Sequence, residues 1–315
     1  MPARTLTVFD PAPRLSIHLR GSLDDVDEVH LHAGGQGIWI ARMATVLGAS
    51  PCLCGPFGDE SGAVIAALLE AEGVATEAVP GSGANGVSVY SGHEGDPGTA
   101  IAGTPNPHLE RHALDALYNA ALASALETSV CVLAGVADDD VLPVDTFRRL
   151  TVDLRANDVR VLADLSGGQL EAAAAGGIDL VKVSDEDLLG RESPPLEAVR
   201  SAVRDLLDRG AANVVVSRAS EGAYASVEGR EYIVRGPELE VVNPRGAGDA
   251  MTGAMAATLA SGGSYLDAIR LATAAGAANV TRHGMATGDR ATIERLADRV
   301  VAEDWHGGGD TGALG

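Results

Sequence analysis

Apolar residues recur along the chain in two alternating periods, and this alternation predicts the fold class. Short runs that are apolar at every position, such as Val130–Leu133 and Val214–Val216, are typical of parallel strands covered by helices on both faces. Longer runs with apolar positions three and four residues apart lie between them and indicate helices. We therefore predict an α/β fold with a doubly wound, mostly parallel sheet, with strands at 129–133, 159–164, 179–183 and 213–217 and helices at 109–125, 144–157, 168–175 and 195–209.

The first hundred residues add a stricter alternation to this pattern. Strands at 6–9 and 51–54 and helices at 37–47 and 61–72 continue the α/β rhythm. Residues 15–19, 29–32 and 87–90 instead alternate apolar and polar, which indicates strands with one face exposed or covering a ligand. The first two are joined by the acidic turn Asp24-Asp25. The glycine-rich stretch 92–103 is expected to be a mobile loop or lid element.

The C-terminal third completes a single predicted domain. A hairpin is expected at 223–227 and 231–234, a strand at 239–242, and helices at 250–262, 265–281 and 291–302. No internal repeat or linker divides the chain, so we expect one domain over residues 1–305. Residues 306–315 are rich in glycine and are expected to form a flexible tail.

Composition narrows the range of partners. The chain has 315 residues and a formal net charge of −21, which argues against nucleic acid or an anionic membrane surface as a partner. No uncharged apolar run reaches the roughly 18 residues of a membrane span, and the N-terminus lacks the apolar core of a signal peptide. The chain has an odd number of cysteines, and their spacing is not typical of a metal site: Cys52, Cys54 and Cys131. We expect buried free thiols in a cytoplasmic protein.

The stretch Asn243-Pro-Arg-Gly-Ala-Gly-Asp249 carries the strongest chemical signal. Gly246 and Gly248 lack Cβ atoms, so the backbone can turn tightly and approach a ligand closely. A helix is expected to begin near Ala247, and the unpaired N–H groups and dipole at its start favour phosphate or a developing anion. Asp249 either caps this helix or takes a proton from a hydroxyl that attacks a phosphoryl group held by the same amides.

A second glycine-rich stretch, Ala33-Gly-Gly-Gln-Gly37, opens another helix. Together the two stretches resemble the two signatures of the ribokinase family of sugar kinases, also called the phosphofructokinase-B family. The resemblance extends from Leu6 to about Gly288. It implies a carbohydrate kinase that uses ATP and Mg²⁺, and a small β-sheet lid over the sugar, built here from about 10–33 and 85–103. It also makes Asp249 the catalytic aspartate, with the transferring phosphate held by Gly246, Ala247 and Gly248.

The resemblance assigns one element to the metal. The stretch from Lys182 to Leu188 resembles the family's Lys-Pro-Asn-x-x-Glu-Leu element, which organises Mg²⁺ and its waters near the phosphates. Here Ser184 replaces the Asn and Asp187 replaces the Glu, a shorter carboxylate that can act through water. The alternative is that Ser184 caps a helix with an acidic first turn.

Two further segments are candidates for the nucleotide. The loop that follows strand 213–217 resembles the family's nucleotide loop, so Ser217, Arg218 and Gly222 are expected to contact ATP phosphates. The alternative is an ordinary connection from a strand to a hairpin. Asn279 matches the position where the family approaches adenine, or else it is an Asn on a helix surface.

The sugar side departs from the branch that the chain resembles most, the fructose 1-phosphate and tagatose 6-phosphate kinases. In the branch's Thr-Leu-Asn-Pro-Ala-x-Asp, Asp10 replaces the Asn and Arg14 replaces the sugar-binding Asp. In its Gly-Gly-Lys-Gly-x-Asn, Gln36 replaces the Lys and Trp39 replaces the Asn. Two sugar contacts and one cationic phosphate contact are thus altered together. The candidates for substrate binding are Asp10, Arg14, Gly34, Gly35, Gln36, Trp39, Arg42 and Arg245.

Three of these substrate-side residues, Arg42, Arg245 and Trp39, also have a structural interpretation. Arg14, Arg42 and Arg245 are the cations nearest the motifs and would suit bidentate phosphate contact in place of the lost Lys. Arg42 is otherwise a charge on a helix surface, and Arg245 an ion pair within its loop. Trp39 stacks on a sugar face or fills the hinge of the lid. Gly34 and Gly35 would let the sugar sit close to the backbone.

Three functions remain open from the sequence. The first is ATP-dependent phosphorylation of a hydroxyl of a sugar or sugar phosphate. The second is a kinase of a non-phosphorylated sugar, a polyol or a nucleoside, although an aromatic content of 3% offers little for base stacking. The third is a non-catalytic sugar or nucleotide sensor, which the altered sugar motifs favour and the intact Gly-Ala-Gly-Asp disfavours. An exposed edge of the lid sheet would also allow a homodimer through the lid.

Overall fold

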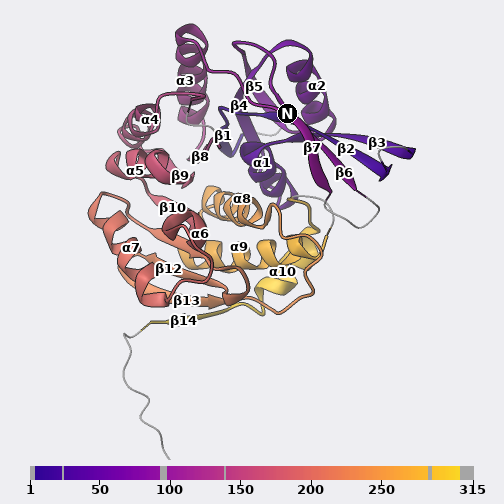
Figure 1. Cartoon of the computed structure of the whole chain (residues 1–315). Coiled ribbons are helices and arrows are strands. Elements are labelled where there is room, and N and C mark those ends of the chain that lie inside the picture. The colour runs from indigo at the N-terminus through magenta and orange to yellow at the C-terminus, as the bar shows by residue number, and fades with distance from the viewer. Residues whose placement is uncertain (1–3, 23–24, 93–97, 138–139, 283–285, 306–315) are drawn as a thin grey trace, which may run out of the picture.

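A ten-stranded sheet crosses the centre of the molecule in the computed structural model, which describes residues 4–22, 25–92, 98–137, 140–282 and 286–305 (Figure 1). From β11 to β5 neighbouring strands run parallel, and β12, β13 and β14 extend the sheet antiparallel. This confirms the predicted mostly parallel sheet. In spatial order the strands are β14 (Val301–Asp304), β13 (Arg230–Arg235), β12 (Ala223–Val227), β11 (Val214–Ser217), β10 (Leu180–Ser184), β9 (Arg160–Asp164), β8 (Val130–Ala134), β1 (Leu6–Phe9), β4 (Pro51–Phe57) and β5 (Ala75–Pro80).

Helices cover both faces of this sheet, because side chains alternate along each strand between two apolar cores. Val8 and Leu53 belong to one core, whereas Phe9 and Cys54 belong to the other. The first core is closed by α1 (Gln36–Val46), α2 (Asp59–Ala71), α8 (Ala247–Ala260), α9 (Tyr265–Val280) and α10 (Arg290–Ala297). The second is closed by α3 (Arg111–Leu126), α4 (Asp145–Arg155), α5 (Gly167–Ala175) and α7 (Leu196–Asp208). The predicted doubly wound architecture is confirmed.

Helix α8 is the element that places the Gly-Ala-Gly-Asp stretch. Alanine, glycine and threonine make up most of α8 and α9, and the two helices pack against each other and are largely buried. Small side chains allow two helix backbones to approach closely. The N-terminus of α8 lies at the carboxyl ends of the parallel strands, beside β9 and β10. In such sheets, ligands bind at this edge.

A separate four-stranded sheet forms the predicted lid and projects to one side of the main sheet (Figure 1). Residues 93–97 and Asp24 of the predicted turn lie outside the described residues. Of the two alternatives for the glycine-rich stretch, the lid element is observed for residues 99–104, because they pair antiparallel with β6. The strand order is β3 (Asp25–Gly34), β2 (Arg14–Ser22), β6 (Gly86–Gly92) and β7 (Thr99–Thr104).

Two predictions for the C-terminal third are wrong. Residues 239–242 form no strand, because the edge of β13 is taken by β14 and the N–H groups of Val242 and Asn243 donate to the carbonyl of Val280 instead. The helix predicted at 291–302 ends at Ala297. The chain then turns back as β14, where Glu303 pairs with Arg235 at 2.9 Å.

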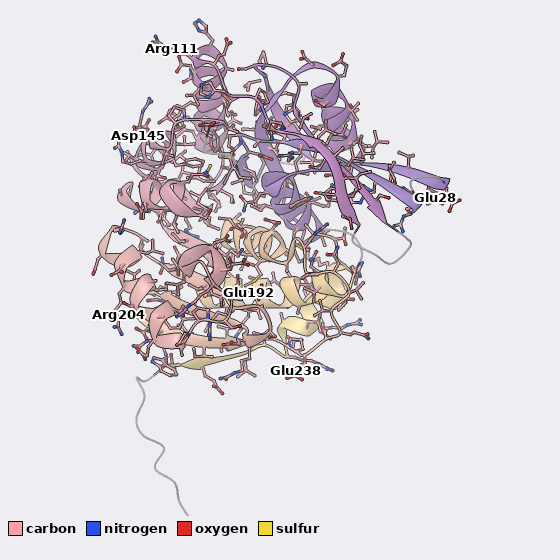
Figure 2. The ribbon with its side chains drawn as sticks, viewed as in Figure 1. Glu28, Arg111, Asp145, Glu192, Arg204 and Glu238 are labelled. Carbon is pink, nitrogen blue, oxygen red and sulfur yellow. The ribbon has the colours of Figure 1, made fainter. Side chains whose placement is uncertain are left out.

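The predictions made from composition can be compared with the structure. All three cysteines are free and buried, as expected. Charged side chains such as those of Glu28, Arg111, Asp145 and Arg204 point outward over the surface (Figure 2). Among the helices that the structure describes, none is both long and apolar enough to span a bilayer. The predicted tail, residues 306–315, lies outside the described part of the chain.

Candidate active site

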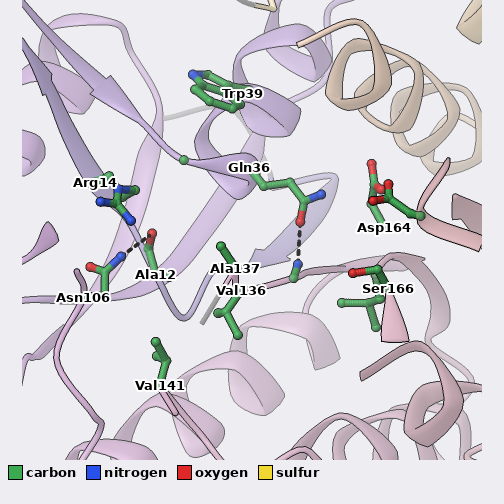
Figure 3. A pocket seen from close by; sticks show the side chains of 14 residues that line it. Ala12, Arg14, Gln36, Trp39, Asn106, Val136, Ala137, Val141, Asp164 and Ser166 are labelled. Carbon is green, nitrogen blue, oxygen red and sulfur yellow. Dashed lines mark hydrogen bonds between the residues drawn. The ribbon is translucent and has the colours of Figure 1, made fainter. Parts of the chain in front are cut away.

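A cavity of about 310 Å³ opens between the lid and the carboxyl ends of the central strands. Figure 3 shows its walls: Arg14 from the lid, Gln36 and Trp39 from the start of α1, and Asp164 from the end of β9. The loop that follows β8 and the short helix α6 (Asp185–Leu189), which carries Asp187, close it further. Several of the residues that the sequence pointed to, far apart in the chain, thus line one cavity.

Asp249 lies in the first turn of α8, beside this cavity. Gly246 precedes the helix with φ 76°, a left-handed conformation that favours glycine, and no side chain caps it. A Cβ on Gly248 would collide with the Nζ atom of Lys182, so glycine lets the lysine lie directly against the helix start. The Asp249 carboxyl faces Gln36, Asp164 and Lys182. It is therefore placed among polar and charged side chains.

A buried ion pair supports this arrangement. Lys182 on β10 donates to Asp164 on β9 at 3.2 Å, and the side chains are only 6% and 8% exposed. Thr252 on α8 donates to the same carboxylate at 2.6 Å. The pair therefore ties two strands to the helix that carries Asp249. Asp164 was not among the predicted site residues, although its place at the end of a buried parallel strand was a usable signal.

The surroundings shift the acid–base behaviour of Asp249. Loss of solvation, followed by the negative charge of Asp164, raises the pKa of Asp249 to about 7. Lys182 and a side-chain hydrogen bond with Gln36 act in the opposite direction. A carboxylate with a pKa near neutral is suited to accept a proton during a reaction.

Comparison with known proteins assigns this site to a family. The model of pfkB family carbohydrate kinases matches residues 6–292. The chain belongs to the pfkB family of carbohydrate kinases. The ATP-dependent 6-phosphofructokinase isozyme 2 of Mycobacterium tuberculosis is 30% identical to it over 271 residues, which cover 84% of this chain and 78% of the relative. The 1-phosphofructokinase of Vibrio cholerae is 26% identical over 283 residues, 89% of each chain.

Solved structures support the same fold for this pfkB family member. The crystal structure of Phosphofructokinase-2 from Escherichia coli in complex with potassium superposes with a TM-score of 0.81 at 24% identity. The match covers 94% of this chain and 99% of that chain. The ribokinase-like architecture inferred from two short motifs is therefore confirmed.

The element that the resemblance assigns to the metal has the helix-capping geometry of the structural alternative. Ser184 precedes α6, accepts from the N–H of Asp187 at 3.0 Å and donates to its carboxylate at 2.6 Å. Asp187 also lines the cavity, as Asp164 does. In the described residues no three His, Cys, Asp or Glu side chains are grouped to hold a metal. Mg²⁺ commonly binds through one or two carboxylates with phosphates and waters, and Asp187 fits that requirement.

Two of the predicted nucleotide contacts, Arg218 and Gly222, have structural roles within the protein. Arg218 is buried, donates to the carbonyl of Pro194 at 2.7 Å and pairs with Glu221 at 2.6 Å, which does not support a phosphate contact. Gly222 closes the short 3-10 turn η1 (Ala219–Glu221) with φ 87°. Ser217, at the end of β11, is partly exposed and stays a candidate.

Asn279 has a structural role instead of a surface position. Its side chain is fully buried, so adenine cannot reach it in this conformation. The amide donates to the carbonyl of Arg245 at 2.8 Å and accepts from the N–H of Ala286 at 2.7 Å. Asn279 thus fixes the loop that leads into α8.

The three candidate arginines have different partners in the structure. Arg42 binds both carboxylate oxygens of Glu72 at 2.8 Å, so the structure favours the helix-surface interpretation. Arg245 stacks over Tyr90 of the lid, 5.5 Å from the ring centroid. Arg14 lines the cavity and donates one guanidinium N–H to the carbonyl of Thr104 at 2.8 Å. Arg14 is therefore the arginine best placed to meet a substrate.

The two glycines before α1 behave differently. A Cβ on Gly34 would come within 2.6 Å of the hydroxyl of Ser16, so this glycine serves the packing of β2 against β3. Gly35 lines the cavity. Trp39 also lines it while packing against the apolar core, so both of its predicted roles stay open.

Asp10 lies beneath the start of α1 and does not line the cavity. It is 1% exposed, one carboxyl oxygen accepts from the N–H of Ala12 at 3.1 Å, and the other has no hydrogen-bond partner among the described residues. Burial raises the pKa of Asp10 to about 7. The structure gives it a supporting position under the helix, where the related branch carries an uncharged Asn.

We expect Asp10→Asn to stabilise the protein above neutral pH. Because the folded-state pKa is raised from an ordinary 3.8 to about 7, the wild-type protein loses stability as pH rises between these values, by roughly 2–4 kcal/mol. Urea unfolding at pH 5 and pH 8 measures the effect. The advantage of the variant should grow towards pH 8, while Asp205→Asn on the exposed side of α7 should show no such growth. An equal effect at both pH values would contradict this account.

Proposed function

We propose that this protein transfers the γ-phosphoryl group of ATP to a hydroxyl of a sugar phosphate, with Asp249 as the general base. One observation carries the proposal: Asp249, with a pKa near neutral, lies at the N-terminus of α8 beside a cavity whose lid side presents Arg14. The relatives named as phosphofructokinases support the same class of acceptor.

The chemistry requires few groups. The acceptor hydroxyl gives its proton to the Asp249 carboxylate while its oxygen forms a bond to the γ-phosphorus. The bond from that phosphorus to the bridging oxygen breaks, and ADP leaves with the electron pair. The first N–H groups of α8 and the Nζ of Lys182, held against Gly248, offset the negative charge on the transferring group.

ATP and Mg²⁺ are the implied co-substrate and metal. Bound Mg²⁺ would neutralise phosphate charge, and Asp187 is the residue that we expect to hold it through water. We place the nucleotide phosphates between α8 and Ser217, without a contact from Arg218 or Asn279. The buried contacts of these two residues support that exclusion.

The phosphate already present on the acceptor is assigned to Arg14. Its guanidinium reaches the cavity from the lid with Asn106 beside it, and Trp39 lines the same cavity (Figure 3). Gln36 occupies the position of the cationic residue in the related branch and brings no charge. Arg14 therefore supplies the positive charge that a lysine provides in that branch. Its guanidinium can bind a phosphate through two N–H groups at once.

We expect Arg14→Gln to weaken the phosphosugar selectively. Loss of a charge-assisted contact costs about 1.5–3 kcal/mol, so KM for a fructose phosphate should rise about 10–100-fold with a smaller change in kcat. The KM for ATP should stay within about twofold. Arg42→Gln is the matched control, since Arg42 is paired with Glu72, and it should leave both constants near their wild-type values. Equal effects of the two substitutions would exclude Arg14 as the phosphate contact.

A homodimer through the lid is also proposed. The edge strands β3 and β7 carry Val29, Leu31 and Ile101, which are 55%, 42% and 42% exposed. Exposed apolar side chains on a sheet edge favour pairing with another copy.

A further inference from the structure

Gln36 connects the loop after β8 to the carboxyl of Asp249. Its side-chain oxygen accepts from the backbone N–H of Gly135 at 2.5 Å. That bond fixes the orientation of the amide, so its NH₂ group points the other way, towards the side of the cavity where Asp164 lies (Figure 3). The Asp249 carboxyl is on this side, and Gln36 is among the side chains that lower its pKa.

Helix packing holds both partners in place. Gln36 is the first residue of α1, Asp249 lies in the first turn of α8, and the two helices pack together along their buried faces. A Cβ on Gly253 of α8 would come within 2.5 Å of the carbonyl oxygen of Ile40 in α1. This close approach fixes how far apart the starts of the two helices lie, and these starts carry Gln36 and Asp249.

We propose that Gln36 is a positioning residue for phosphoryl transfer: anchored by the Gly135 N–H, its amide orients the Asp249 carboxylate and keeps it ionised for proton transfer. The proposal rests on the proposed role of Asp249 as base. It gives a function to a residue that sequence comparison alone registers as the loss of a lysine. The uncharged amide stabilises the carboxylate without neutralising it.

The charged and polar groups around Asp249 determine in which direction a substitution of Gln36 should shift the pKa of Asp249. Asp164 on β9 and Lys182 on β10 face it from the sheet, and Gln36 faces it from α1. Asp164 disfavours the ionised carboxylate, whereas Lys182 and Gln36 favour it. Removing the amide should therefore raise the pKa of Asp249 further above 7, and a cation in its place should lower it.

The test compares Gln36→Leu with Gln36→Lys over the pH profile of kcat/KM. We expect the acidic limb to move up by about 1 pH unit in Gln36→Leu and down in Gln36→Lys, because a hydrogen bond to a charged group contributes on that scale. At pH 6.5 kcat of Gln36→Leu should fall about tenfold, with recovery towards pH 9. A limb that stays in place in both variants would overturn the proposal.

Gln169 provides a matched control. It is another buried glutamine that binds the same loop, accepting from the N–H of Val136 at 3.0 Å and donating to its carbonyl at 2.9 Å. Gln169→Leu removes a similar anchor of this loop, one residue further along at Val136. It should leave the acidic limb where the wild-type protein has it, even if stability falls. A shift equal to that of Gln36→Leu would reduce Gln36 to a loop anchor and contradict the proposal.

A second measurement separates this proposal from the proposed function. The Asp249 carboxyl can be titrated by NMR in protein carrying ¹³C-labelled aspartate, with Asp249→Asn identifying its signal. An upward shift in Gln36→Leu supports the contact even in a protein that turns over no acceptor, which would refute the kinase role alone. An unchanged titration beside normal turnover would refute the role of Gln36 alone.

Discussion

Asp249→Asn is expected to lose about 10²–10⁴-fold in kcat, the range that general-base catalysis contributes. The asparagine keeps the size of the side chain but cannot accept the proton of the acceptor hydroxyl. Steady-state ADP release with ATP and Mg²⁺ at pH 8 measures the effect. Binding of ATP, followed by calorimetry, should change much less than kcat.

The fold should survive this substitution. Because the pKa of Asp249 is raised to about 7, the ionised carboxylate costs folding energy above that pH, and the asparagine removes this cost. We therefore expect the Tm of Asp249→Asn at pH 8 to equal or exceed that of the wild-type protein. A turnover within about threefold of wild type would remove Asp249 from the role of base. A strongly lowered Tm would mean that the carboxylate stabilises the helix.

Lys182→Met is expected to destabilise the protein by about 3–5 kcal/mol, the usual effect of breaking a buried ion pair by removing one partner. The substitution leaves Asp164 buried with Thr252 as its remaining donor in the network described here. Urea unfolding at pH 8 gives the free energy of unfolding. The double variant Lys182→Met/Asp164→Leu should recover part of the loss, since both charges are then gone.

An exposed pair serves as the control for this comparison. Arg148 and Asp145 are 44% and 58% exposed, so Arg148→Met should leave the free energy of unfolding almost unchanged. Lys182 is the only lysine in the sequence, so ¹⁵N-lysine labelling gives one side-chain ammonium signal that reports on the pair. A loss below about 1 kcal/mol in Lys182→Met would show that the pair does not stabilise the fold.

The sequence predicted the parts of the fold that follow from hydrophobic periodicity. The buried strands, the helices that cover them and the small lid sheet are all present at or near the expected residues. Periodicity gave no partner for the run 239–242, whose N–H groups bond to the end of α9. It also missed β14, since two apolar residues followed by two acidic ones carry little signal, and their pairing with β13 makes them a strand.

The site was predicted where a motif fixed it and was missed where only tertiary contacts define it. The glycines and Asp249 at the start of α8 were identifiable because a loop that opens a helix is a local feature. Arg14 and Arg42 could not be distinguished from the sequence. The structure separates them because Arg42 pairs with Glu72, which lies 30 residues further along the chain. The contact of Gln36 with Gly135 spans 99 residues, so no spacing in the sequence indicates it.

The most direct test of the account is ADP release by the wild-type protein with ATP and Mg²⁺ over a panel of acceptors. The panel contains fructose 6-phosphate, fructose 1-phosphate and tagatose 6-phosphate, their unphosphorylated sugars, and a nucleoside. The account predicts turnover on a phosphosugar, with kcat/KM at least about tenfold above that for the same sugar without phosphate. Preference for an unphosphorylated acceptor, or bound ATP without turnover on any of them, would contradict it.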